Sequence, residues 1–202
     1  MAKRSAPEVN AGSMADIAFL LLIFFLVTTT IETDSGISRK LPPWQPEDVE
    51  PPVIKQRNIF TVLVNSNNQL LVEDEEMEIS DLRDAAVEFL DNGAGTGDEA
   101  CSFCQGAKDP NSSVNPQKAI ISLVNNRGTE YGTYIAVQNE LVAAYNQLRD
   151  REAQRMYGMS FTEMEDKYND PQFNGDKDAL KEKIDVVTNM IPQKLSEAEP
   201  TS

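Results

Sequence analysis

The sequence predicts an α+β protein with a single N-terminal transmembrane helix, a proline-rich linker and one small domain whose helices pack on one mixed sheet. Three observations support this architecture: a long apolar run near the start, a proline cluster after it, and two apolar strand-like runs among segments with helical periodicity. The 171 residues that follow the apolar run are enough for one domain with a modest core.

Residues 9–31 form a 23-residue run in which Asp16 is the only charged side chain. At about 1.5 Å per residue, a helix of this length spans a bilayer core of roughly 30 Å. Placing a carboxylate in such a helix costs about 2.5–3.5 kcal/mol, so Asp16 needs a partner, a water-filled path or a function. The alternative is a plain signal anchor in which Asp16 lies near the membrane interface.

The charges that flank the run predict its orientation. Lys3 and Arg4 precede it, whereas Glu32 and Asp34 follow it, so residues 1–8 are expected to be a cytoplasmic tail with the domain outside. No small-x-small cleavage site follows closely, which favours an uncleaved signal anchor.

Residues 32–57 are expected to link the membrane to the domain. Five of the eleven residues from 42 to 52 are proline, which favours an extended, semi-rigid spacer. Before them, Ile37–Leu41 mixes apolar and basic residues like a short edge strand.

The domain is expected to cover residues 58–198. Ile59–Val64 predicts a strand apolar enough to be buried on both faces, and Gln69–Val72 returns as the second strand of a hairpin. Ser80 is placed to cap a helix that ends at Asn92-Gly93, and Lys118–Asn125 predicts a second core strand.

The second half of the domain is predicted to be mainly helical. After Arg127-Gly128, apolar side chains at steps of three and four continue to Leu148. The polar stretch 149–176 contains a possible short helix at 162–168. An amphipathic helix at 178–190 stops before Pro192, and residues 193–198 can form a last short strand.

Residues 91–117 resemble an inserted loop and contain the pair Cys101 and Cys104. A CxxC pair is compatible with a redox motif, but thioredoxin-type chemistry places it at a helix start that follows a strand. Because a loop surrounds the pair here, a small loop-closing disulfide is the favoured interpretation.

Composition argues against enzymatic and nucleic-acid functions. The chain has no histidine, which removes Ser-His-Asp and Cys-His catalysis and histidine metal sites, and two cysteines are too few for a four-thiolate zinc site. We therefore expect no metal and no enzymatic activity. The net charge of −15 lies entirely on residues 32–202, because the four charges before them cancel, so nucleic-acid binding is excluded.

The N-terminal motif resembles the ExbD/TolR family of biopolymer-transport proteins. Asn10 lies six residues before Asp16, the apolar run IAFLLLIFFLV follows, and ISRKLPP at 37–43 is similar to a short family segment that ends in Leu-Pro. The resemblance extends over residues 8–90 and 118–148, although Ser13-Met14-Ala15 stands where the family often has a proline.

This resemblance implies an ExbD-like subunit of a proton-motive-force-driven inner-membrane motor that energises TonB-dependent outer-membrane transport. It assigns Asp16 as proton acceptor and donor, with Asn10 and Ser13 as proton-path support and protons as the coupling ion, without a cofactor. It also assigns Ile37, Leu41 and Pro42 to a segment that offers a strand edge to a strand of a partner protein. Helical spacing places Leu20, Ile23 and Val27 on the face of Asp16, where they are expected to pack against other helices.

The resemblance also implies partners and a location. Expected partners are a second copy of the chain, a pentamer of a multi-spanning ExbB/TolQ-type protein and a TonB-type periplasmic protein, with peptidoglycan as a further candidate. The expected location is the bacterial inner membrane, single-pass, with the C-terminal domain in the periplasm. Two alternatives stay open: a TolR-like subunit of the Tol-Pal system that binds peptidoglycan, and a membrane-anchored periplasmic binding module without proton coupling.

Overall fold

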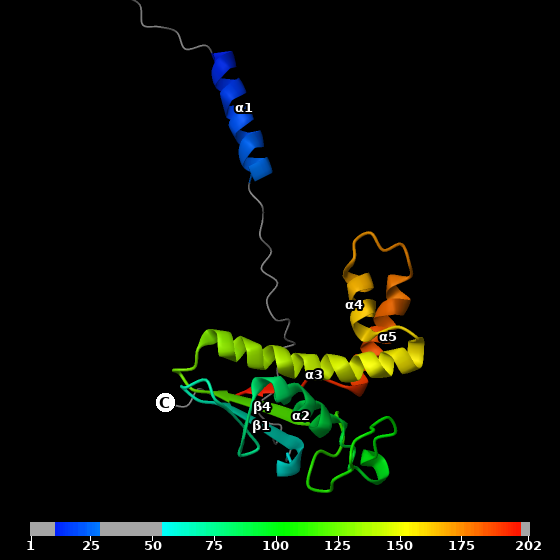
Figure 1. Ribbon diagram of the computed structural model, residues 1–202. Helices are drawn as coiled ribbons and strands as arrows, with labels where there is room; N and C mark the ends of the chain where they lie inside the picture. The colour runs from blue at the N-terminus through cyan, green and yellow to red at the C-terminus, as the bar shows by residue number, and fades with distance from the viewer. Residues whose placement is uncertain (1–10, 29–53, 199–202) are drawn as a thin grey trace, which may run out of the picture. The chain divides into compact units, whose positions relative to one another are not determined.

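The computed structural model describes residues 11–28 and 54–198, which belong to two compact units, 1–50 and 51–202 (Figure 1). In the first unit, Ala11–Thr28 forms helix α1, which covers 18 of the 23 residues of the predicted span. The other five residues lie outside the described ranges. Within those ranges, no helix is both long enough and apolar enough to cross a membrane. The transmembrane helix therefore stays a prediction.

The second unit is built on a five-stranded mixed sheet in the order β3-β2-β1-β4-β5. The central strand β1 runs parallel to β4, and β4 runs parallel to the edge strand β5, whereas β1–β2 and β2–β3 are antiparallel hairpins. This sheet confirms the predicted fold class of helices on one mixed sheet. The strands are β1 Ile59–Val64, β2 Leu70–Val72, β3 Glu75–Met77, β4 Ile120–Asn125 and β5 Leu195–Glu197.

The two central strands alternate between a buried and a half-exposed face. Phe60, Val62 and Val64 of β1 are buried, and so are Ile121 and Leu123 of β4. The residues between them are only half-buried, so the prediction that β1 is buried on both faces is wrong. Helices cover one face of this sheet, and none of the described elements packs as a second layer on the other (Figure 1).

Four helices complete the unit. Helices α2 and α3 pack against each other over the sheet, and the main core lies between them and the buried strand faces (Figure 1). The helices are α2 Ile79–Asp91, α3 Tyr131–Tyr157, α4 Phe161–Asn169 and α5 Lys177–Met190, and short 3-10 turns occur at Gln56–Asn58 and Gly97–Glu99.

The ends of α2 differ in part from the expectation. Glu78 rather than Ser80 occupies the N-cap position, and its side chain makes no capping hydrogen bond. Ser80 lies inside the helix, where its hydroxyl donates to Asp81 Oδ1 at 3.3 Å. At the other end, Gly93 adopts the left-handed conformation (φ 68°) that ends the helix, whereas Asn92 stays right-handed.

Helix α3 extends nine residues beyond Leu148, and α4 and α5 pack against this extension. The three helices enclose a second apolar cluster, and the short helix expected at 162–168 is confirmed as α4. Ser160 and Asp176 cap α4 and α5 through hydrogen bonds from Glu163 N and Ala179 N. The buried members of the cluster are Ala153, Phe161, Met164, Leu180 and Val187.

Arg149 joins the two apolar clusters. Its Nε donates to the carbonyl of Ile191 at 3.0 Å, and its guanidinium lies 5.1 Å from the centre of the Phe161 ring. Burial lowers the pKa of Arg149 and raises the pKa of Glu165, and the attraction between the two charges opposes both shifts. Helices α4 and α5 are therefore attached to the rest of the domain by the buried cation of Arg149 as well as by apolar contacts.

The glycine at the end of α2 gives a test of the fold. A Cβ at Gly93 would lie 2.6 Å from Cys104 Cβ, whereas at Gly158 (φ 69°) it would meet no atom within 4 Å. Gly158→Ala is expected to cost about 1–2 kcal/mol for the left-handed conformation alone. Gly93→Ala should cost about 1–3 kcal/mol more because of the overlap. Urea unfolding of both variants checks this, and equal losses would contradict the close approach of the loop to α2.

Candidate functional site

Helix α1 places Asp16, Leu20, Ile23 and Val27 on one face, because their spacings of four, three and four residues match the helical repeat. The large apolar side chains from Met14 to Val27 are 41–73% exposed and surround the helix on all sides. A helix that is apolar all round requires apolar surroundings, which lipid or other helices provide.

Two residues of this face also form part of a shallow apolar hollow on α1. Leu20 and Ile23 line it together with Ile17, Leu21 and Phe24. Such a depression between side chains at steps of three and four can receive a side chain from a neighbouring helix. The geometry therefore fits the helix-packing role expected for Leu20 and Ile23.

The side chains of five other predicted site residues cannot be placed by the described part of the structure. Asn10, Ile37, Leu41 and Pro42 lie outside the described residues, and Ser13 belongs to α1 without a described side chain. Their roles as proton-path support and as a partner-strand segment stay predictions.

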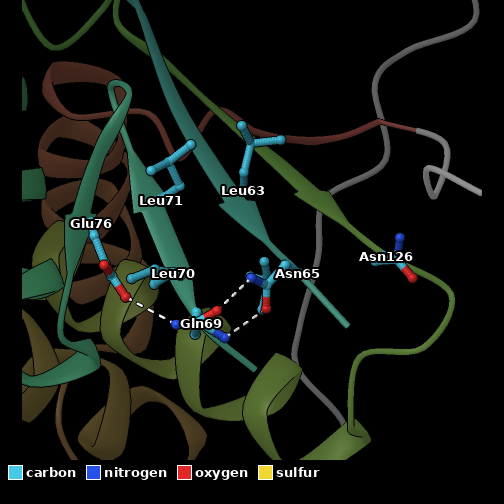
Figure 2. Close-up of a pocket in the computed structure, with 8 residues that line it drawn as sticks. Leu63, Asn65, Gln69, Leu70, Leu71, Glu76 and Asn126 are labelled. Carbon is cyan, nitrogen blue, oxygen red and sulfur yellow. Dashed lines mark hydrogen bonds between the residues drawn. The ribbon is translucent and has the colours of Figure 1, made fainter. Parts of the chain in front are cut away.

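A groove of about 390 Å³ lies on the second unit, at the carboxyl end of β1 (Figure 2). Asn65 Nδ2 donates to Gln69 Oε1 at 2.9 Å, and Gln69 Nε2 donates to Glu76 Oε1 at 3.1 Å. The sequence indicated only a turn here, although the amide-rich stretch 65–69 was a signal for a polar rim. The lining residues are Leu63, Val64, Asn65, Gln69, Leu70, Leu71, Glu76 and Asn126.

The groove continues into the half-exposed face of the sheet. Three cross-strand pairs lie side by side there, Ile59–Ile120, Thr61–Ser122 and Leu63–Val124, and Leu71 beside them is 36% exposed. Aliphatic side chains with amide donors and acceptors at one end suit an extended peptide or another apolar surface. Glu76 is the ionisable group among the lining residues, so the groove has no nucleophile paired with a base.

The loop between α2 and β4 contains the bonded pair Cys101–Cys104, with the Cα atoms 5.5 Å apart. Asn92 Nδ2 holds the loop by donating to the carbonyls of Asp109 at 2.9 Å and Ser113 at 2.8 Å. Asn58 Oδ1 accepts from Val114 N at 3.1 Å. A ring closed across so few residues removes little chain entropy, about 2 kcal/mol. The hydrogen bonds therefore hold most of the loop in place.

An ion-pair network fixes the base of this loop. Arg151 donates to both carboxylate oxygens of Asp91 at 2.6 and 2.8 Å, and this hydrogen bonding raises the pKa of Arg151. Glu152 is fully buried and accepts from Arg151 Nε at 3.1 Å and Arg155 Nε at 2.8 Å. These pairs join the end of α2 to the C-terminal third of α3.

The described residues contain no group of three or more His, Cys, Asp or Glu side chains arranged to hold a metal ion.

Comparison with protein families gives a match to the family described as Biopolymer transport protein ExbD/TolR over residues 2–149. The match covers most of the chain, so the protein belongs to the ExbD/TolR family, as the N-terminal motif predicted. Members of this family are in general non-enzymatic transport subunits of the inner membrane that work with ExbB/TolQ-type proteins. Comparison with individual curated proteins gives no match. Helices α4 and α5 and strand β5 lie beyond the matched range.

The polar rim of the groove depends on Asn65, whose Oδ1 accepts from Asn67 N and Gln69 N, each at 2.9 Å. Asn65→Ala is expected to lower the free energy of unfolding by about 1–2 kcal/mol, because two backbone donors lose their acceptor. Asn67→Ala in the same turn is the matched control and should cost less than half as much. Thermal or urea unfolding measures both, and equal losses would rule out this role of Asn65.

Proposed function

We propose that the chain is an ExbD-like subunit of a proton-motive-force-driven motor of the inner membrane, which energises TonB-dependent transport across the outer membrane. The observation that carries this proposal is the single carboxylate of Asp16 on an apolar helix, in a chain that belongs to the ExbD/TolR family. In this proposal, residues 9–31 span the membrane, the N-terminus is cytoplasmic and the C-terminal domain is periplasmic.

The proposed mechanism rests on the two charge states of Asp16. When protonated, its side chain is compatible with the apolar face of Leu20, Ile23 and Val27, whereas the ionised form requires water or a hydroxyl group. Each elementary charge that crosses 100 mV supplies about 2.3 kcal/mol, so a few protons can drive a conformational step. Asn10 and Ser13 would hydrogen-bond the carboxyl group from the preceding turns, and the mechanism requires no cofactor beyond protons.

The apolar circumference of α1 also supports the proposed assembly. Two copies of α1 would lie inside a pentamer of an ExbB/TolQ-type protein, so that every side of the helix meets an apolar partner. In the periplasm, Ile37, Leu41 and Pro42 would offer a strand edge to a TonB-type protein.

Neutralising Asp16 tests the motor. Asp16→Asn should still co-purify with the ExbB/TolQ-type partner but reduce energy-dependent transport by at least about 100-fold, because the amide neither takes up nor releases a proton in this cycle. Uptake of a TonB-dependent substrate in cells measures the loss.

Two variants serve as controls for this experiment. Glu32→Gln removes a carboxylate just after the apolar run and should leave transport intact, and Asp16→Glu keeps a titratable group and should retain part of it. Retained uptake in the Asp16→Asn protein, with the partner bound, would show that Asp16 is not the coupling group.

A TolR-like role in the Tol-Pal system is the second candidate, because the matched family includes both types. The net charge of −15 disfavours tight binding to an acidic cell wall. We therefore expect the purified full-length protein in detergent to stay in solution when peptidoglycan is sedimented at physiological salt. Salt-resistant co-sedimentation would favour the TolR-like assignment, and isolation without any ExbB/TolQ-type partner would favour a simple anchored binding module.

A further inference from the structure

The pair Cys101–Cys104 contributes little to holding its loop. Asn92 and Asn58 bind the loop backbone from outside the disulfide ring, and Asn115 Nδ2 donates to the carbonyl of Glu99 at 2.9 Å. The two cysteines are only three positions apart, so the bond closes a short ring, and Phe103 inside that ring packs against the main core independently of the bond. A crosslink with so small a structural contribution can open and close while the domain stays folded.

The backbone also makes the two sulfur atoms unequal. The amide N–H of Cys104 points at Cys101 Sγ, with the nitrogen and sulfur 3.1 Å apart. A donor at this position stabilises negative charge on Cys101 when the bond is broken. Among the described residues, no backbone N–H donates to Cys104 Sγ in the same way. Both cysteines are partly exposed, so the pair is not enclosed in the core.

We propose that Cys101–Cys104 is a redox-active pair that exchanges electrons with a CxxC-type dithiol protein of the extracytoplasmic compartment. The thiolate of that protein attacks Cys104 Sγ, the Cys101–Cys104 bond breaks, and Cys101 leaves as a thiolate that the Cys104 N–H stabilises. The second thiol of the partner then attacks the mixed disulfide and releases Cys104. Two electrons and two protons pass to the pair, and the partner leaves as a disulfide.

The loop geometry allows this exchange without unfolding. Phe103, between the two cysteines, packs against the main core, and the Asp91–Arg151 pair fixes the base of the loop. These contacts do not involve the sulfur–sulfur bond, so the reduced loop keeps its attachment to α2 and α3. The proposal rests on the proposed periplasmic location of the domain, but not on the motor function of Asp16.

The first experiment reduces the full-length protein in detergent with thioredoxin, thioredoxin reductase and NADPH at neutral pH. We expect stoichiometric NADPH consumption, maleimide labelling of both cysteines and an unchanged circular dichroism spectrum. The Cys101→Ser/Cys104→Ser protein is the blank and should consume none. Labelling that requires denaturant would overturn the proposal and leave a structural disulfide.

The second experiment tests the inequality of the two sulfur atoms. In Cys104→Ser the remaining Cys101 thiol should react with iodoacetamide about threefold faster than the Cys104 thiol in Cys101→Ser. The expected difference is small because the gain in thiolate that the Cys104 N–H provides is partly offset by the lower nucleophilicity of a stabilised thiolate. Each variant is the matched control of the other, and equal or reversed rates would overturn the assignment of Cys101 as the leaving group.

Discussion

The parallel pairing of β1 with β4 is the constraint on which the rest of the domain depends. Parallel neighbours cannot be joined by a tight turn, so after the hairpins of β2 and β3 the chain between Met77 and Ile120 must leave the sheet and return over one of its faces. The same condition applies between β4 and β5, which are also parallel. The connections that lead to β4 and then to β5 both advance in the same direction along the sheet. Because such connections are right-handed, they place their helices on the same face of the sheet. The open face and its groove are consequences of this arrangement.

Local patterns were sufficient to predict the main elements, and long-range partners explain what they missed. The apolar runs at 59–64 and 118–125 predicted the central strands, and apolar steps of three and four predicted the helices. Strand β3 was missed because Glu75 and Glu76 have no strand-like pattern and are ordered by pairing with β2. The length of α3 was underestimated because the residues after Leu148 are mostly polar. One of them, Glu152, is buried in the fold, where ion pairs with Arg151 and Arg155 compensate its charge.

The candidate sites show the same division. A carboxylate inside an apolar run is a local signal, so Asp16 and the residues that share its helix face were accessible from spacing alone. The nearness of Cys101 to Cys104 was accessible for the same reason. The groove could not be predicted from the sequence, because Leu63, Gln69 and Asn126 come from three segments that only the strand pairing brings together. Predicting it would have required knowledge of which face the helices leave open.

The family match ends at residue 149, yet the folded unit does not end there. Strand β5 completes the sheet through Ile121↔Leu195, and the Tyr145 hydroxyl donates to the carbonyl of Lys194 at 3.3 Å. Arg149, at the last matched position, is a buried cation whose hydrogen-bond acceptor and aromatic contact both come from beyond the match. Removing those partners would leave its charge buried without compensation, which is strongly unfavourable. The core of the folded unit therefore requires residues beyond the family match, because Leu195, Ile191 and Phe161 supply the partners of Ile121 and Arg149.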